Sequence, residues 1–319
     1  MEKSLIQVNQ SVELRTAASK AHDYIAQAKA KNTIKSYRAD WQDFTTWCNN
    51  NNLIELPADP ETVAVYLAHL AETSKVSTLQ RRISAISQAH QAAGHPSPTC
   101  TMEVRAVMAG IRRERGSAQA GKAPVLVDDI KAMVDTLPDN LIGIRDRALL
   151  LLGFAGAFRR SELISLDVED IEFSREGITV TLRKSKTDQE GHGRKIGIPY
   201  GSNIDTCPVR SLQAWLEGSG INEGPLFRSI NRHGSLQQGR LSDKAVALVV
   251  KRTTEAAGLD PVMYSGHSLR AGLATSAAMA GVSERAIMNQ TGHRSVSMVR
   301  KYIREGSLFR DNAAAGLGL

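Results

Sequence analysis

From residue 267 to residue 304 the sequence reads HSLRAGLATSAAMAGVSERAIMNQTGHRSVSMVRKYIR. Apolar residues recur at helical spacing in three segments of this stretch, which predicts helices at 268–280, 283–290 and about 296–304. Histidine, arginine and tyrosine residues stand at the ends and on the faces of these segments. The stretch therefore predicts a helical fold whose short helices present polar side chains.

Four residues of this stretch suit chemistry on a phosphate group. His267 and Arg270 are three residues apart, so a helix that begins there directs both side chains to the same side. The free amides of such a helix N-terminus also attract a phosphate. His293 can donate to a phosphate oxygen, and Tyr302 can act as a nucleophile if positive charge lies nearby, because its ordinary pKa is about 10. Basic residues flank the tyrosine: Arg300, Lys301 and Arg304.

Two further cationic candidates lie upstream. Arg159 precedes Glu162 by three residues, so on a helix the carboxylate can orient the guanidinium group. Lys186 lies in the polar, glycine-containing stretch 185–193, which predicts the loop of a β-hairpin. A lysine can act as a general acid when neighbouring cations lower its pKa. Cleavage of a phosphodiester without a metal needs such a set of residues: a nucleophile, planar guanidinium donors and a proton donor.

In chain order the candidates are Arg159, Lys186, His267, Arg270, His293 and Tyr302. This order, with its local spacings of three and nine residues, resembles the catalytic signature of the tyrosine recombinase superfamily. These DNA strand transferases include the phage integrases and the Cre-like and Xer-like recombinases. The resemblance selects Arg159 over Arg160 through the pattern Arg-x-x-Glu-Leu, and Lys186 over Lys184 and Lys195. It extends along the whole chain, but its motifs are specific only in the C-terminal half.

The resemblance implies a site-specific DNA recombinase that cleaves and rejoins strands through a 3′-phosphotyrosyl intermediate, for integration, excision or resolution. Tyr302 would be the nucleophile, and Arg159 and Arg270 would bind the non-bridging phosphate oxygens. Lys186 would protonate the leaving 5′-oxygen, and His267 would accept a proton or orient a neighbouring group. The implied partner is double-stranded DNA with paired recombination sites, on which a homotetramer assembles with or without accessory proteins.

The sequence departs from the commoner family pattern at two places. Ala271 and Gly272 follow the second arginine, where many members carry His-Thr or a similar pair, and Thr291 stands where leucine is common. Neither departure removes a candidate catalytic side chain. The C-terminal residues Leu308 and Phe309 are apolar enough to dock on a neighbouring protomer, as such tails commonly do in this family, or to pack in cis.

Length and composition predict two domains, since 319 residues with 42% hydrophobic content can form two cores of typical size. We place a flexible arm at 1–19, a helical domain at 20–115, a small polar linker at 116–123 and a second domain with a tail at 124–319. The resemblance implies that 20–115 is a DNA-binding domain of the SAM-like, core-binding type and that 124–319 is the catalytic domain. The fold class is mainly α with a small antiparallel β-sheet (α+β).

The expected elements follow from apolar periodicity, caps and turn residues. In the first domain we expect four helices: one from about 32, one from the Asp59-Pro60-Glu61 start, one from Ser77 to Gly94, and one at 102–113. In the second domain we expect helices at 127–137, 145–154, 208–218 and 243–257, strands around 178–182 and 196–199, and the three helices given above.

Composition excludes several other classes of protein. The formal net charge is +7, and both predicted domains share the positive excess, which favours contact with a polyanion. Cys48, Cys100 and Cys207 are too few and too scattered for a disulfide framework or a zinc site. No apolar run approaches about 20 residues, and the N-terminus lacks the core of a signal peptide. We therefore expect a cytoplasmic protein with no metal, cofactor or membrane partner. The resemblance implies a bacterial, phage or plasmid origin and association with the nucleoid.

Two other readings of the sequence remain open. A DNA-binding regulator would use the helices and the positive charge without cutting DNA, and it would form no detergent-resistant adduct with DNA. A nicking and closing enzyme of the type IB topoisomerase kind would use similar chemistry as a monomer. Assembly of four protomers on paired sites would distinguish a recombinase from such an enzyme.

Overall fold

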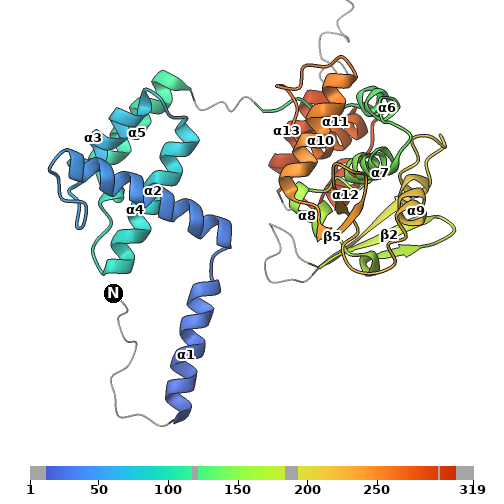
Figure 1. Ribbon diagram of the computed structural model, residues 1–319. Coiled ribbons are helices and arrows are strands. Elements are labelled where there is room, and N and C mark those ends of the chain that lie inside the picture. The colour runs from blue at the N-terminus through green and yellow to red at the C-terminus, as the bar shows by residue number, and fades with distance from the viewer. Residues whose placement is uncertain (1–11, 117–120, 184–192, 294, 307–319) are drawn as a thin grey trace, which may run out of the picture. The chain divides into compact units, whose positions relative to one another are not determined.

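The computed structural model describes residues 12–116, 121–183, 193–293 and 295–306 (Figure 1). The chain divides into two compact units, Met1–Ala120 and Gly121–Leu319. Both units are mainly helical, and the second also contains small antiparallel sheets, so the predicted fold class is confirmed. Lys186 with its loop, the apolar tail residues Leu308 and Phe309, and residues 1–11 of the predicted arm lie outside the described residues.

The first unit is a small helical bundle. Its elements are α1 (Val12–Gln27), α2 (Lys31–Asn50), α3 (Pro60–Ala71), α4 (Val76–Ala93), the 3-10 turn η1 (Pro98–Cys100) and α5 (Met102–Arg115). The four predicted helices correspond to α2 to α5. Helix α1 begins inside the stretch that was expected to be an arm. Helix α4 ends at Ala93, and the next residue, Gly94, has a φ of +79°, as the expected glycine stop requires.

The core of this bundle comes from regularly spaced apolar residues. Phe44 of α2, Tyr66 and Leu67 of α3, and Leu79 and Ile86 of α4 are fully buried. The spacing in α2 places the aromatic stripe inward, as predicted, because residues three and four positions apart share one face of a helix. The bundle therefore has a hydrophobic core of its own.

The second unit contains the candidate residues. Its helices are α6 (Val127–Asp135), α7 (Leu141–Ala155), α8 (Arg160–Ser165), α9 (Pro208–Ser219), α10 (Asp243–Ala256), α11 (Ser268–Met279), α12 (Glu284–Thr291) and α13 (Val296–Gly306). Its other elements are the 3-10 turn η2 (Val168–Asp170) and the strands β1 (Ile171–Phe173), β2 (Gly177–Leu182), β3 (Arg194–Pro199), β4 (Arg228–Ile230) and β5 (Leu236–Arg240). Strands β1, β2 and β3 form one antiparallel sheet in that order, and β4 pairs with β5.

Helix α7 forms the centre of this unit. Its run Leu149-Leu150-Leu151-Leu152 is buried, as the unbroken apolar sequence predicted. The helix starts at Leu141, four residues before the expected position, because the side chain of Asn140 accepts a hydrogen bond from the amide of Gly143 and so caps it. The sequence-based prediction of this helix did not include Asn140 as its N-cap. Among the described residues, no helix has both the length and the apolar character needed to span a membrane.

Helices α11, α12 and α13 pack together at the C-terminal end of the unit (Figure 1). Ala274 and Ala278 of α11 and Val299 of α13 are buried in their shared cluster, and Tyr302 and Ile303 pack against it. Small alanine side chains let α13 approach α11 closely. The position of Tyr302 is therefore set by the apolar face of its own helix.

The start of α11 lies against the segment that leads into α6. The amide of Val125 donates to the carbonyl oxygen of Ser268 at 3.0 Å. A Cβ at Gly272 would lie 1.8 Å from the carbonyl oxygen of Val125, so only glycine permits this approach. The departure from the family pattern at Gly272 is thus a packing requirement of this chain.

Replacing Gly272 by alanine should separate α11 from this segment and destabilise the second unit by about 1–3 kcal/mol, the usual cost of overpacking. Gly218 lies near the end of α9, where a Cβ would make only ordinary contacts of 3.8 and 3.9 Å. Gly218→Ala should therefore stabilise the unit by about 0.5–1 kcal/mol. Calorimetric unfolding of the full chain measures both variants, and equal effects of the two substitutions would contradict this description of the α11 contact.

Candidate active site

Arg270 is the buried centre of the candidate site. It lies in the first turn of α11 and is 0% exposed. Its Nη1 donates to the carbonyl oxygen of Ala157 at 2.7 Å, and its Nη2 lies 3.2 Å from Nε2 of His293. Its Nε has no hydrogen-bond partner in the part of the chain that the structure describes. Burial, together with the positive charge of Arg159, lowers the pKa of Arg270 to about 10, so the group remains a cation at neutral pH.

The acceptor for Arg270 comes from an unusual backbone conformation. Ala157 has a φ of +49°, in the left-handed region that residues with a Cβ seldom adopt. It lies in the short connection between α7 and Arg159. Such strain persists only where surrounding contacts enforce it. Here the conformation turns the carbonyl oxygen of Ala157 toward the guanidinium group of Arg270.

Arg159 stands at the residue before α8 and pairs with Glu162. The Glu162 side chain is 2% exposed; its Oε2 accepts from the backbone amide of Arg159 at 2.9 Å and its Oε1 pairs with Nη1 of Arg159. The predicted pair is therefore present, but Arg159 precedes the helix instead of lying on it. Arg160, the first residue of α8, packs over Gly266, where a Cβ would lie 2.2 Å from Cδ of Arg160.

His293 follows the end of α12. Gly292 ends that helix with a φ of +67°, and Nδ1 of His293 lies 2.8 Å from Oγ1 of Thr291. Burial and the positive charges of Arg270, Arg159, His267 and Arg194 together lower the pKa of His293 to about 4. His293 is therefore neutral at physiological pH. Thr291, one of the two departures from the family pattern, contacts Nδ1 of this ring.

Tyr302 lies close to both histidines. Its hydroxyl oxygen is 3.2 Å from Nε2 of His267, and its ring centroid is 5.9 Å from that of His293. An ionised Tyr302 also attracts Arg270, which acts to raise the pKa of the arginine. We expected Arg300 to contribute to the positive charge around Tyr302. Its guanidinium group instead pairs with the carboxylate of Glu284 in α12, at 3.1 Å. Arg270 therefore contributes to the positive field at Tyr302.

Arg194, which the sequence analysis overlooked, holds the end of α12 in place. It begins β3, and its guanidinium group donates to the carbonyl oxygens of Asn289 and Gln290 at 3.1 Å and of Thr291 at 3.4 Å. Burial lowers its pKa. A Cβ at Gly292 would lie 2.7 Å from this guanidinium, so the glycine is required both for its φ and for the contact. Strand alternation could have identified Arg194, since it shares the inward face with two buried isoleucines.

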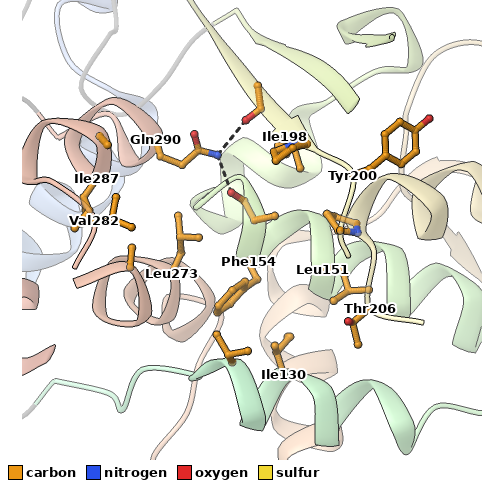
Figure 2. A pocket seen from close by; sticks show the side chains of 18 of the residues that line it. Ile130, Leu151, Phe154, Ile198, Tyr200, Thr206, Leu273, Val282, Ile287 and Gln290 are labelled. Atoms are coloured by element: carbon orange, nitrogen blue, oxygen red, sulfur yellow. Dashed lines mark hydrogen bonds between the residues drawn. The ribbon is translucent and has the colours of Figure 1, made fainter. Parts of the chain in front are cut away.

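A second contact ties α12 to the rest of the unit. Nε2 of Gln290 donates to the carbonyl oxygen of Ala155 at 2.8 Å and to that of Gly197 at 3.3 Å, and Figure 2 shows both bonds beside an apolar cavity. The cavity has a volume of about 490 Å³, and Leu151, Phe154 and other apolar side chains line it. None of the five described candidate residues lines this cavity. Gln290 therefore holds α12 in place without being part of the candidate site.

The structure thus brings together five of the six candidates: Arg159, His267, Arg270, His293 and Tyr302. The sixth, Lys186, lies outside the described residues. The assembled groups are the hydroxyl of Tyr302 next to the imidazole of His267, the buried guanidinium group of Arg270 beside the neutral imidazole of His293, and the half-buried guanidinium group of Arg159. The described residues contain no group of three or more histidine, cysteine or carboxylate side chains that could hold a metal ion. This arrangement suits the binding of an anion next to Tyr302.

Comparisons with known proteins identify the family of this chain. The family described as "Phage integrase family" matches residues 125–307, and "Phage integrase, N-terminal SAM-like domain" matches residues 22–95. The integrase/recombinase xerD homolog of Selenomonas ruminantium is 46% identical over 298 residues, which cover 92% of this chain and 87% of that protein. The recombinase cre of Escherichia phage P1 is 27% identical over 299 residues, which cover 87% and 85% of the two chains.

A solved structure shares the fold. The XerH site-specific recombinase, bound to a palindromic difH substrate in a post-cleavage complex, superposes with a TM-score of 0.61 at 17% identity, covering 81% of this chain and 72% of that chain. The chain belongs to the phage integrase family, and so to the tyrosine recombinases. Its enzyme class is that of the site-specific DNA recombinases, as the resemblance in the sequence predicted.

The different environments of Arg159 and Arg160 lead to a prediction. Arg159→Lys keeps the charge but loses the planar set of donors, so cleavage should slow by about 100-fold or more, as when a fixed donor to a reacting oxyanion is removed. Arg160→Lys should change the rate by no more than about threefold, because its contact is packing over Gly266. Single-turnover cleavage of a suicide DNA substrate at saturating protein measures both. An inactive Arg160→Lys beside an active Arg159→Lys would show that the arginine assignment is wrong.

Proposed function

We propose that this recombinase cleaves DNA by attack of Tyr302 on a scissile phosphate and that it forms a 3′-phosphotyrosyl intermediate. The hydroxyl oxygen of Tyr302 forms a bond to phosphorus, and the bond from phosphorus to the 5′-oxygen breaks. Nε2 of His267, 3.2 Å from that hydroxyl, accepts the tyrosine proton or orients the hydroxyl. Lys186 supplies a proton to the leaving 5′-oxygen. Rejoining is the reverse sequence, with a 5′-hydroxyl as the nucleophile.

One observation carries this proposal: Arg270 is a fully buried cation whose Nε–H lacks a partner among the described residues. A buried donor without an acceptor costs about 1–3 kcal/mol, and more when it is charged. A phosphate oxygen that reaches this donor would remove the cost. The positive charges of Arg159 and Arg194 also act on Arg270, and Glu162 is the carboxylate that opposes them. The three arginines and one carboxylate together carry a net positive charge, which favours an anionic ligand.

The roles assigned to the arginines follow from their contacts. Arg159 is fixed by the buried carboxylate of Glu162, and Arg270 by the carbonyl oxygen of Ala157. Two guanidinium groups held in this way keep donors available for the non-bridging oxygens without reorganisation during the reaction. The energy of the broken phosphodiester is conserved in the phosphotyrosyl bond, so the reaction requires no nucleotide cofactor.

The proposed partner is double-stranded DNA with paired recombination sites. We propose that residues 20–115 form a core-binding domain, residues 116–123 a linker, and residues 124–319 the catalytic domain, and that both domains contact the duplex. Four protomers would assemble on two sites in the cytoplasm, with accessory proteins where a particular site needs them. A net charge of +7 supports broad contact with phosphates, which should make binding steeply dependent on salt concentration.

The nucleophile can be tested by a substitution that keeps the ring. Tyr302→Phe removes the hydroxyl oxygen but retains the packing of the ring against α11, so the variant should bind DNA with unchanged affinity and form no covalent adduct. Denaturing gels of a suicide-substrate reaction detect the adduct. The wild-type protein should form it in the presence of a chelator, since cationic side chains provide the phosphate binding. An adduct at wild-type yield from Tyr302→Phe would exclude Tyr302 as the nucleophile.

A further inference from the structure

A chain of hydrogen bonds runs from Arg270 through His293 to the end of α12. Nη2 of Arg270 lies 3.2 Å from Nε2 of His293, and Nδ1 of His293 lies 2.8 Å from Oγ1 of Thr291. The same hydroxyl oxygen lies 2.7 Å from the carbonyl oxygen of Ile287. All three distances are within the range of a hydrogen bond. The side chain of a buried threonine is therefore connected to the buried arginine through one imidazole ring.

The bond between Arg270 and His293 determines which atom donates and which accepts in each of the other bonds. A guanidinium group has donors and no acceptor, so Nε2 of His293 accepts from Arg270 and carries no proton. The neutral ring must then carry its proton on Nδ1, which donates to Oγ1 of Thr291. The hydroxyl proton of Thr291 remains for the carbonyl oxygen of Ile287. Each of the three bonds in this chain then has one donor and one acceptor, and only this tautomer of His293 satisfies all three.

We propose that in the DNA-free protein Thr291 is a positioning residue, whose hydroxyl selects the tautomer of His293 protonated on Nδ1. In this tautomer His293 is an acceptor that orients Arg270, and not the phosphate donor that the sequence suggested. The Arg270 side chain is then held at two points, by the carbonyl oxygen of Ala157 on Nη1 and by His293 on Nη2. The effect of Thr291 on DNA cleavage rests on the proposed function, in which Arg270 binds the scissile phosphate.

The burial of Thr291 makes its hydroxyl necessary. The residue is 0% exposed, so solvent does not replace an acceptor that is lost there. Without an acceptor for the Nδ1 proton, the ring can move this proton to Nε2. An Nε2–H group would then face the N–H donors of Arg270, and the bond between them would be lost. The charged groups around His293 do not determine the tautomer, since Arg270, Arg159, His267 and Arg194 all act to keep the ring neutral.

The test compares three substitutions in the full-length protein. Thr291→Val has nearly the same shape but lacks the hydroxyl, and Thr291→Ser keeps the hydroxyl. Thr254→Val is the matched control, because Thr254 of α10 is also fully buried and also donates to the carbonyl oxygen four residues earlier, that of Val250, at 2.9 Å. Nitrogen-15 NMR of the imidazole groups in the DNA-free protein reports the tautomer, and His293→Gln assigns the His293 signals.

In the NMR measurement, wild type, Thr291→Ser and Thr254→Val should show His293 protonated on Nδ1, and Thr291→Val should lose this preference. In single-turnover cleavage Thr291→Val should be about tenfold slower, which corresponds to about 1.4 kcal/mol and to the upper range for one net hydrogen bond. Thr291→Ser should recover most of the rate. In a His293→Ala background, Thr291→Val should slow cleavage by less than about twofold, because the two residues act as a unit.

The two measurements separate failure of this inference from failure of the proposed function. If wild type shows the Nδ1 tautomer but forms no covalent product with DNA, the tautomer assignment is supported and the proposed function is wrong. A wild-type ring protonated on Nε2, or an unchanged tautomer in Thr291→Val, would overturn the inference. So would a Thr291→Val rate equal to that of Thr254→Val, or a full additional loss in the His293→Ala background.

Discussion

The burial of Arg270 as a cation is the constraint on which the site depends. A charge removed from water costs several kcal/mol unless hydrogen bonds and counter-charges offset that cost. Within the described residues Arg270 has two neutral acceptors, Ala157 and His293, and its Nε–H has none. Other cations act on it as well, since Arg159 and Arg194 both lower its pKa. The free protein therefore retains an unfavourable arrangement that an anion can relieve.

The surrounding fold is built to hold this arrangement. A left-handed Ala157 presents one acceptor, and close packing of α11 against Val125, which Gly272 permits, fixes the turn that carries the arginine. Arg194 fixes the end of α12 and so the ring of His293. Each of these contacts involves backbone atoms, whose positions are less adjustable than those of side chains. These contacts therefore limit how far the side chains of the site can move.

The sequence was sufficient for the elements whose signals are local. The aromatic stripe of α2, the apolar run of α7 and the order of the candidate residues predicted helices and a site that the structure contains. The sequence was insufficient where contacts between distant segments determine the position of a residue. Arg159 precedes α8 because Glu162 binds its backbone amide, and half-buried Arg194 binds the end of α12, a contact that its inward strand position alone does not predict. The hairpin of β4 and β5 was also overlooked, since the polar run 236–240 lacks an alternating pattern.

The central claim is that the cations around Arg270 hold a phosphate of DNA within reach of Tyr302. Locating the DNA on the protein tests this claim most directly. The covalent product of a suicide substrate is digested with nuclease and protease, and the modified peptide is sequenced by mass spectrometry. We expect one modified residue, Tyr302, joined to a nucleotide through its 3′-phosphate. A nucleotide attached to any other residue, or a linkage through a 5′-phosphate, would contradict the account.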